Sequence, residues 1–219
     1  MKIGILFDLD GTLLDTLEDL KDAVNYTMGQ FGCPERSLDE VRNFIGTGAA
    51  NLIRKALPGK ESDPPLEEAL AVYQAYYAAH AQDRTGPYEG VLQALEQISI
   101  RYPVAIVSNK PDGATKTLCA AHFPGIFARG ESTDCPRKPA PDMLYKAMKQ
   151  IGVDTCVYVG DSETDVQTAR NTGVPCLSVL WGFRDKVCLQ NAGATYFCEK
   201  PADLLNMLEA VISEACYGK

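Results

Sequence analysis

The sequence lacks closely spaced cysteine pairs and long apolar runs, and it has few histidines. Its eight cysteines form no C-x-x-C pair and it has only two histidines, so we expect no structural zinc site. No segment approaches the ~20 apolar residues that span a bilayer, and the apolar stretch before Asp8 is too short for a signal peptide. We therefore expect a cytoplasmic protein without a membrane partner, whose reduced cysteines act mainly as small core hydrophobes.

Basic residues are outnumbered by acidic ones. The chain contains 21 Lys and Arg residues against 29 Asp and Glu residues, a formal net charge of -8. This balance argues against a nucleic-acid partner, because phosphate backbones are bound by clustered Lys and Arg side chains. It does not exclude a small phosphorylated ligand, because a local cation or metal can bind one while exposed charges beyond ~10 Å are screened.

Most of the chain alternates between short β-rich runs and helical patterns. The runs are Ile3 to Phe7, Val104 to Val107, Cys156 to Val159, Cys176 to Leu180 and Thr195 to Cys198, and helices are expected over 89–100, 112–122, 140–151, 162–172 and 201–215. The nearly continuous apolar content of each run is typical of strands buried on both faces of a parallel sheet. The sequence therefore predicts an open, doubly wound α/β domain.

Only helical periodicity is found between Thr16 and about His80. A Ser37-x-x-Glu40 capping box opens one helix, residues 66–81 are rich in Ala and Tyr, and an earlier helix has an apolar face made of Leu17, Leu20, Val24 and Met28. Gly86 and Pro87 interrupt the helical pattern before the α/β alternation resumes. We therefore expect a helical cap domain over 16–82, inserted into a core made of 1–15 and 83–219.

Two aspartates follow the first expected strand. Asp8 and Asp10 are two residues apart, and in an extended segment such residues point to the same side. One carboxylate of such a pair can act as a nucleophile while the other donates and accepts protons, and Gly11 allows a sharp turn whose N–H groups face the substrate. Two like charges about 4 Å apart repel by about 4 kcal/mol at an effective dielectric near 20, so the pair implies a cation.

Polar residues also follow the other expected strands. Ser108 and Asn109 can donate hydrogen bonds to phosphoryl oxygens, and Lys138, in a proline-rich turn, offers a point charge for a phosphate. Asp161 and Asp165 follow a strand-end glycine and resemble a hard-cation site of oxygen ligands. Each has a plain structural alternative, such as a loop cap, a solvated charge or a helix N-terminal acid. Jointly they favour Mg²⁺, which offsets the repulsion between the aspartates and an incoming phosphate.

These residues together resemble the motifs of the haloacid dehalogenase-like superfamily of phosphohydrolases. Its motifs appear in order as Asp8-x-Asp10-Gly11-Thr12, Ser108-Asn109, Lys138-Pro139-x-Pro141 and Gly160-Asp161-x-x-x-Asp165. The resemblance covers nearly the whole chain. It implies a Rossmann-like core with a helical cap inserted just after the first motif, where the sequence shows its all-helical interval.

The resemblance also implies a role for each motif residue. Asp8 would be the nucleophile and a magnesium ligand, and Asp10 the general acid and base, with its backbone carbonyl on the metal. Asp161 would bind magnesium and Asp165 would support that site. Thr12 and Ser108 would position phosphoryl oxygens and Lys138 would stabilise their charge. Dehalogenation is disfavoured, because hydrolytic dehalogenases of the family carry an aromatic residue where this chain has Asp10.

Within the superfamily, the chain is most similar to the phosphoglycolate phosphatase branch. The similar segments are residues 8–16, the cap turn 45–48 and the cap segment 52–57. We expect Gly46 and Gly48 of the cap turn to face the substrate. Arg54 is a candidate contact for a substrate carboxylate, with an exposed surface charge as the equal alternative.

The predicted function is that of a magnesium-dependent phosphatase that hydrolyses a small phosphorylated metabolite through a phospho-aspartate. Phosphoglycolate is the best single guess. An inorganic pyrophosphatase and a sugar-phosphate mutase share the first chemical step and remain alternatives. A phosphate-binding regulatory module is a non-enzymatic alternative, disfavoured because Asp8 and Asp10 would repel a phosphate that is only bound. The sequence leaves open a monomer or a homodimer.

Overall fold

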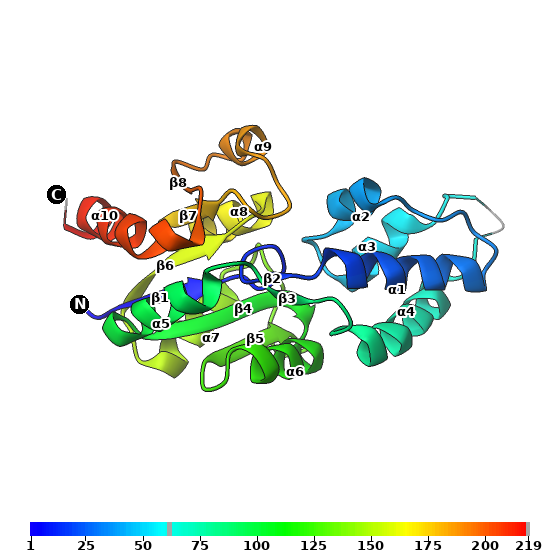
Figure 1. The fold of residues 1–219 in the computed structure, drawn as a ribbon, viewed down its shortest axis with the longest axis horizontal. Coiled ribbons are helices and arrows are strands. Elements are labelled where there is room, and N and C mark those ends of the chain that lie inside the picture. The colour runs from blue at the N-terminus through cyan, green and yellow to red at the C-terminus, as the bar shows by residue number, and fades with distance from the viewer. Residues whose placement is uncertain (61–62, 218–219) are drawn as a thin grey trace.

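The computed structural model describes residues 1–60 and 63–217 as two packed units (Figure 1). One unit is an α/β sandwich and the other is a bundle of four helices. The N-terminus and the C-terminal end of the described chain both lie at the end of the α/β unit that is remote from the helical bundle. The junction between the units is therefore formed by segments from within the chain.

The α/β unit is built on a six-stranded parallel sheet with strand order β5-β4-β1-β6-β7-β8. The strands are β1 (Ile3–Phe7), β4 (Val104–Pro111), β5 (Phe127–Glu131), β6 (Thr155–Gly160), β7 (Cys176–Val179) and β8 (Tyr196–Cys198). The predicted α/β fold with a doubly wound parallel sheet is confirmed. The edge strand β5 was not predicted from the sequence.

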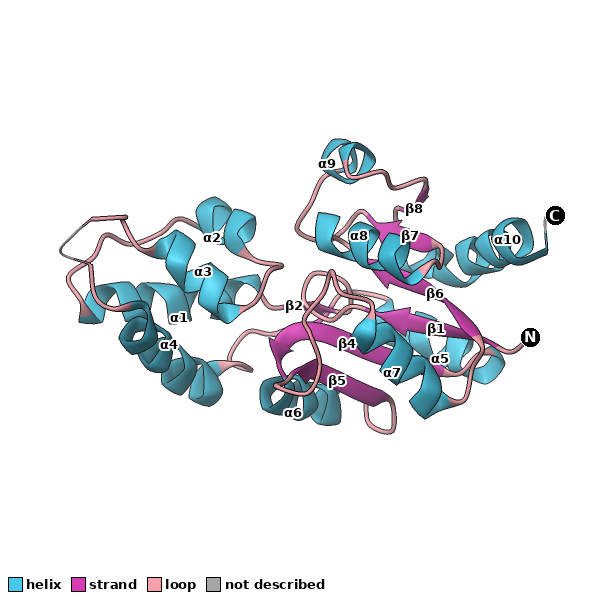
Figure 2. Cartoon of the chain, turned by 180° about the vertical axis from the view of Figure 1, so that it is seen from behind, coloured by secondary structure: helices cyan, strands magenta, loops and turns pink. Residues whose placement is uncertain are grey.

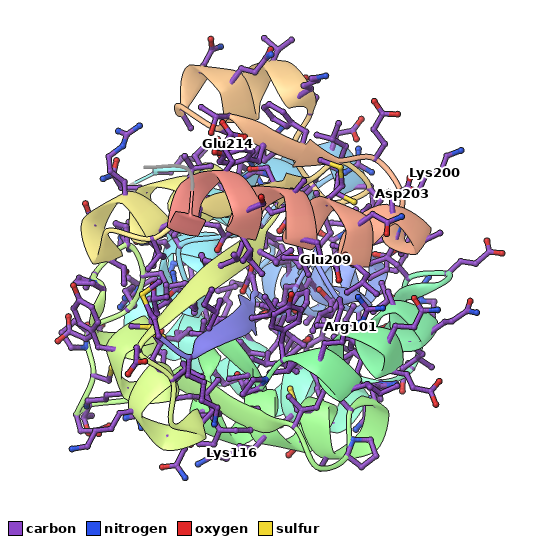
Figure 3. All side chains as sticks on the ribbon, turned by 90° about the vertical axis from the view of Figure 1, so that its left-hand side faces the viewer. Arg101, Lys116, Lys200, Asp203, Glu209 and Glu214 are labelled. Carbon is purple, nitrogen blue, oxygen red and sulfur yellow. The ribbon has the colours of Figure 1, made fainter. Side chains whose placement is uncertain are left out.

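Helices cover both faces of this sheet (Figure 2). Successive residues of β1 point to opposite faces, as Phe7 joins one apolar cluster and Leu6 the other. The Phe7 face is covered by α5 (Val91–Arg101), α6 (Asp112–His122) and α10 (Leu204–Tyr217), and the Leu6 face by α7 (Asp142–Ile151) and α8 (Glu163–Thr172). The short α9 (Lys186–Asn191) packs on α8, and the 3-10 turn η1 (Pro201–Asp203) leads into α10. An ion pair between Arg101 and Glu209 links α5 to α10 on the surface (Figure 3).

The second unit consists of four helices, which we call the cap helices. They are α1 (Leu17–Gln30), α2 (Leu38–Phe44), α3 (Ala49–Ala56) and α4 (Leu66–His80). The predicted apolar face of α1 is buried, and the capping box of Ser37 and Glu40 is present at the start of α2. Tyr73 and Tyr77 of α4 pack inside this unit, and Phe183 of the α/β unit joins the same apolar cluster. The cap helices therefore share part of their core with the sheet unit.

Two chain crossings join the units. The short strands β2 (Leu14–Asp15) and β3 (Gly86–Pro87) pair in antiparallel fashion. The buried Asp19 carboxylate accepts hydrogen bonds from the backbone N–H groups of Arg84 and Thr85 and from the Thr85 hydroxyl, at 2.7–3.1 Å. The first cap helix is thus fixed to the returning segment. We retain 16–82 as the proposed extent of the cap domain.

The cysteines whose side chains are described are reduced and form no disulfide, and Cys119, Cys135, Cys156 and Cys198 are buried. Cys216 lies outside the described side chains. Among the described residues, no helix combines the length and the apolar character that a membrane crossing requires.

Candidate active site

The carboxyl ends of β1, β4 and β6 meet at one edge of the sheet, below the cap helices. β1 lies between β4 and β6, so chain connections leave β1 toward both sides, and the crevice at such a reversal is the usual ligand site of an open α/β sheet. A cavity of about 370 Å³ opens at this point. Asp8, Asp10 and Asp161 line it from below and Leu52 and Tyr77 from the cap.

Three aspartates and one lysine form a buried cluster at the base of the cavity. Carboxylate oxygens of Asp8, Asp161 and Asp165 lie within 4.8 Å of one another. The Lys138 ammonium, only 3% exposed, donates to Asp8 Oδ1 at 2.7 Å, to Asp165 Oδ1 at 2.8 Å and to the Tyr158 hydroxyl at 2.9 Å. Its three N–H donors are therefore all committed. No described residue donates to Asp8 Oδ2, which leaves this oxygen free to react.

The other two aspartates are held by separate hydrogen-bond networks. Asp165 Oδ2 accepts from the Ser162 backbone N–H at 3.1 Å and hydroxyl at 2.6 Å, and its Oδ1 accepts from Tyr158 at 2.9 Å as well as from Lys138. Asp161 accepts from the Thr12 hydroxyl at 3.2 Å and from the Phe183 N–H at 2.7 Å. Asp165 is thus fully engaged and orients Lys138, whereas Asp161 keeps acceptor capacity for a cation.

The electrostatics of the cluster call for a positive ion. Burial and the neighbouring Asp165 raise the pKa of Asp8 well above its ordinary value, although Lys138 opposes the shift. Burial and Asp165 likewise raise the pKa of Asp161 to about 7. A divalent cation would favour the ionised form of both groups. Their hard oxygen donors fit such an ion, so the cluster is a candidate metal site.

Asp10 faces a second lysine. The Lys110 ammonium lies 3.0 Å from Asp10 Oδ1 in an ion pair that lacks good hydrogen-bond geometry, and it donates to the Tyr77 hydroxyl of α4 at 2.8 Å. Ser108 donates a long hydrogen bond of 3.5 Å to Asp10 Oδ2. The Asp10 side chain lies apart from the three-carboxylate cluster, although both aspartates line the same cavity.

Two glycines allow the close packing around the carboxylates. Gly11 has a φ of 85°, in the left-handed region, and a Cβ atom there would overlap Asp161 and Phe183. A Cβ atom at Gly160 would overlap the Asp165 side chain. The strand-end glycines of both aspartate motifs are therefore required by space, and at Gly11 by backbone conformation as well.

The side chain of Asn109 makes hydrogen bonds other than the phosphoryl contact that its strand-end position suggested. Its side-chain oxygen accepts from the Lys138 N–H at 2.8 Å, and its amide nitrogen donates to the carbonyls of Lys138 at 2.9 Å and Gly46 at 3.1 Å. Thr12 likewise points to Asp161. Both side chains thus hold the residues of the site in position. Asn109 also ties the Lys138 turn to the cap.

Of the cap residues suggested by the sequence, two line the cavity and one lies on the outer surface. Gly46 and Gly48 line the cavity, as expected. Arg54 is exposed, pairs with Asn51 on the same helix, and is not among the cavity-lining residues. Its position on the outer surface of α3 leaves it away from any ligand in the cavity.

Sequence reasoning did not single out three polar residues of the site. Tyr158 lies within the apolar strand β6, Lys110 directly follows the Ser-Asn motif, and Arg184 enters from the loop after β7. The Arg184 guanidinium donates to Glu163 at 2.9 Å and to the cap carbonyls of Arg42 and Ile45 at 2.8 and 3.0 Å. The run Ser108-Asn109-Lys110 offered a signal for Lys110, because the lysine continues a strand that already carries two site residues.

A Rossmann-like sheet with a helical cap and an aspartate–lysine cluster at the strand ends defines a class of hydrolase. Residues 5–179 match the family model of the haloacid dehalogenase-like hydrolases. The chain therefore belongs to this family, as the motif resemblance predicted.

Similar proteins narrow the class further. A phosphoglycolate phosphatase of Pseudomonas syringae pv. tomato is 33% identical, over 95% of this chain and 78% of its own length, and one of Aquifex aeolicus is 29% identical, over 96% and 98%. A crystal structure from Lactobacillus delbrueckii, provisionally named a phosphoglycolate phosphatase, has a TM-score of 0.85 and 36% identity, over 95% and 97% of the two chains. With the family match, these similarities identify the chain as a phosphatase.

Proposed function

We propose that the protein is a magnesium-dependent phosphomonoesterase that transfers the phosphoryl group of a small phosphorylated metabolite to Asp8 and then to water. The observation that carries this proposal is the pairing of Asp8 with Lys138 at the base of the cavity. An oxygen of Asp8 is free for attack, while the lysine fixes the other oxygen. Lys138 supplies positive charge next to the position where phosphoryl oxygens must lie.

The reaction divides between the two aspartates. Asp8 Oδ2 attacks phosphorus, the ester P–O bond breaks, and protonated Asp10 gives its proton to the departing alkoxide. Water then attacks the phosphorus of the phospho-aspartate, Asp10 takes the proton from that water, and inorganic phosphate leaves with Asp8 restored. Asp10 lines the same cavity as Asp8 but is separate from the metal cluster, as an acid and base requires.

Asp8 and Asp161 would hold the divalent ion, and Asp165 would orient the lysine beside it. Magnesium is the expected ion because it prefers carboxylate and phosphate oxygens. When bound, it would neutralise charge on the phosphoryl group. Thr12, Phe183 and Asn109 keep the binding groups in place through the hydrogen bonds described above.

Phosphoglycolate is the proposed substrate. The relatives named as phosphoglycolate phosphatases support it, and so does the sequence similarity in the motif segments. The cap contributes a wall of mainly apolar residues, including Leu20, Leu52 and Tyr73, opposite the aspartates. A cytoplasmic location and a monomeric or homodimeric state stay predictions.

The test is phosphate release from phosphoglycolate by purified protein with and without MgCl2. We expect release to require the metal and to be abolished in Asp8→Asn. Intact-mass measurement after an acid quench should show one phosphoryl group on the wild type during turnover and none on Asp8→Asn. Equal release by the two proteins would refute the assignment of Asp8 as the nucleophile.

A further inference from the structure

Lys110 is a buried cation that the phosphoryl-transfer steps leave without a task. Its side chain emerges near the end of β4, is 8% exposed as a residue, and lines the cavity. It contacts Asp10 from the α/β unit and Tyr77 from the cap, and its ammonium lies 4.5 Å from the centroid of the Tyr77 ring. The lysine therefore lies where the two units meet. Its neighbour Asp10 is the proposed acid for the leaving group, so Lys110 lies on the side where the leaving group would bind.

The other two cations among the described residues that line the cavity, Lys138 and Arg184, hold parts of the site together. Lys138 directs its three donors to Asp8, Asp165 and Tyr158. Arg184 uses three of its five N–H donors, one on each guanidinium nitrogen, to bind Glu163 and two cap carbonyls. Lys110 has one well-directed hydrogen bond, to Tyr77, and a poorly directed ion pair with Asp10. Lys110 therefore has a donor left for a ligand at the position next to Asp10.

The surroundings of Lys110 keep it charged. Burial alone would lower the pKa of its ammonium, but the Asp10 carboxylate and the Tyr77 and Tyr73 hydroxyls raise that pKa above its ordinary value. The neighbouring cap wall, with Leu20, Leu52 and Tyr73, offers little to compensate an anion. A negatively charged leaving group could be buried in this part of the cavity only if it were paired with a cation.

We propose that Lys110 determines substrate specificity by binding a carboxylate on the leaving group of the phosphate ester. The inference rests on the proposed phosphomonoesterase activity and adds to it the residue that recognises the leaving group. Because Lys110 touches Asp10, which protonates the ester oxygen, the recognised carboxylate lies within a few atoms of that oxygen. The substrate class is then a short phosphorylated hydroxy acid.

The test compares two esters that differ in one group. Phosphoglycolate carries the carboxylate, and 2-hydroxyethyl phosphate carries a neutral hydroxymethyl group in its place. We expect wild type to prefer phosphoglycolate in kcat/KM by about 30- to 100-fold, as a charge-assisted hydrogen bond predicts. In Lys110→Met the ratio should fall to within about 3-fold of unity, and Lys110→Arg should retain most of the preference.

A control variant and a third substrate make the outcomes distinct. Lys116 is exposed on α6, so Lys116→Met should keep the wild-type ratio (Figure 3). Release of nitrophenol from p-nitrophenyl phosphate reports the phosphatase activity itself, and its absence in wild type would overturn the proposed function and this inference with it. A wild-type ratio near unity, or an unchanged ratio in Lys110→Met, would overturn the role of Lys110 alone. Lys110→Gln provides the same measurement if the Met variant does not fold.

Discussion

The acidic cluster predicts that the metal-free protein loses stability as the pH rises from about 4 to about 7. Burial and the neighbouring Asp165 raise the pKa of Asp161 from an ordinary 3.8 to about 7, so the folded state binds this proton more tightly than the unfolded state does. Between these two values the folded protein holds more protons than the unfolded chain, and its stability falls with pH. At about 1.36 kcal/mol per pKa unit, the full loss by pH 8 is about 4 kcal/mol.

The perturbation that isolates this effect is Asp161→Asn. The neutral amide can accept from the Phe183 N–H and donate to the Thr12 hydroxyl, so both hydrogen-bonded neighbours are kept. We expect the metal-free variant to match wild type near pH 4 and to exceed it by up to about 4 kcal/mol at pH 8. The pKa of Asp8 shifts in the same direction, so a decline in stability with pH should remain in the variant.

The assay is thermal unfolding of EDTA-treated protein at several pH values, with and without MgCl2. For a chain of this size, about 4 kcal/mol corresponds to roughly 8–16 °C in Tm. Magnesium should raise the wild-type Tm more at pH 8 than at pH 5, because it binds the ionised carboxylates, and should have little effect on Asp161→Asn. Asp203→Asn is the matched control, since Asp203 is exposed on the surface (Figure 3). A pH profile of Asp161→Asn that coincides with that of wild type would refute the reasoning.

Three further substitutions test separate parts of the structure. Tyr158→Phe removes the hydroxyl between Lys138 and Asp165. In steady-state kinetics it should lower kcat about 10-fold with a smaller change in KM, and a kcat equal to that of wild type would contradict this. Asp19→Ala removes the acceptor that fixes the returning linker and should lower the unfolding free energy by about 2–4 kcal/mol in urea titrations. Gly11→Ala should lower the unfolding free energy by at least about 1–2 kcal/mol from backbone conformation alone. It should also reduce phosphate release, because the added Cβ atom would overlap Asp161, and undiminished release would argue against the tight turn.

The sequence was informative where apolar periodicity alone decides the structure. Continuous apolar runs predicted β1, β4, β6, β7 and β8, and the helical interval predicted the cap helices. The strand β5 was missed because Phe127–Glu131 includes Arg129, Gly130 and Glu131, residues that a sheet tolerates at its edge. Helix α9 has six residues, too few for periodicity to be recognised.

Site prediction depended on whether a contact lies within one motif or between distant segments. Asp8, Asp161 and Asp165 were foreseen because they follow strands that must end at the same edge. Tyr158 and Lys110 were not, since the apolar strand conceals the first, and the second gains its meaning only when α4 brings Tyr77 against it. The location of Arg54 depends on how α3 is rotated against its neighbours, which helical spacing alone does not define.

The two aspartates of the first motif are paired with two different lysines, Asp8 with Lys138 and Asp10 with Lys110. The attack on phosphorus and the protonation of the leaving group therefore depend on different contacts. Lys138 holds Asp8 entirely within the α/β unit. Lys110 faces Asp10 but also binds Tyr77 of the cap. A change in α4 therefore acts first on the leaving group and its acid. The Asp8–Lys138 pair, which acts on phosphorus, is linked to the cap indirectly, through the hydrogen bond from Asn109 to Gly46. Tyr77→Phe should accordingly alter selectivity between esters more than it alters hydrolysis of the common phospho-aspartate, which single-turnover kinetics can separate.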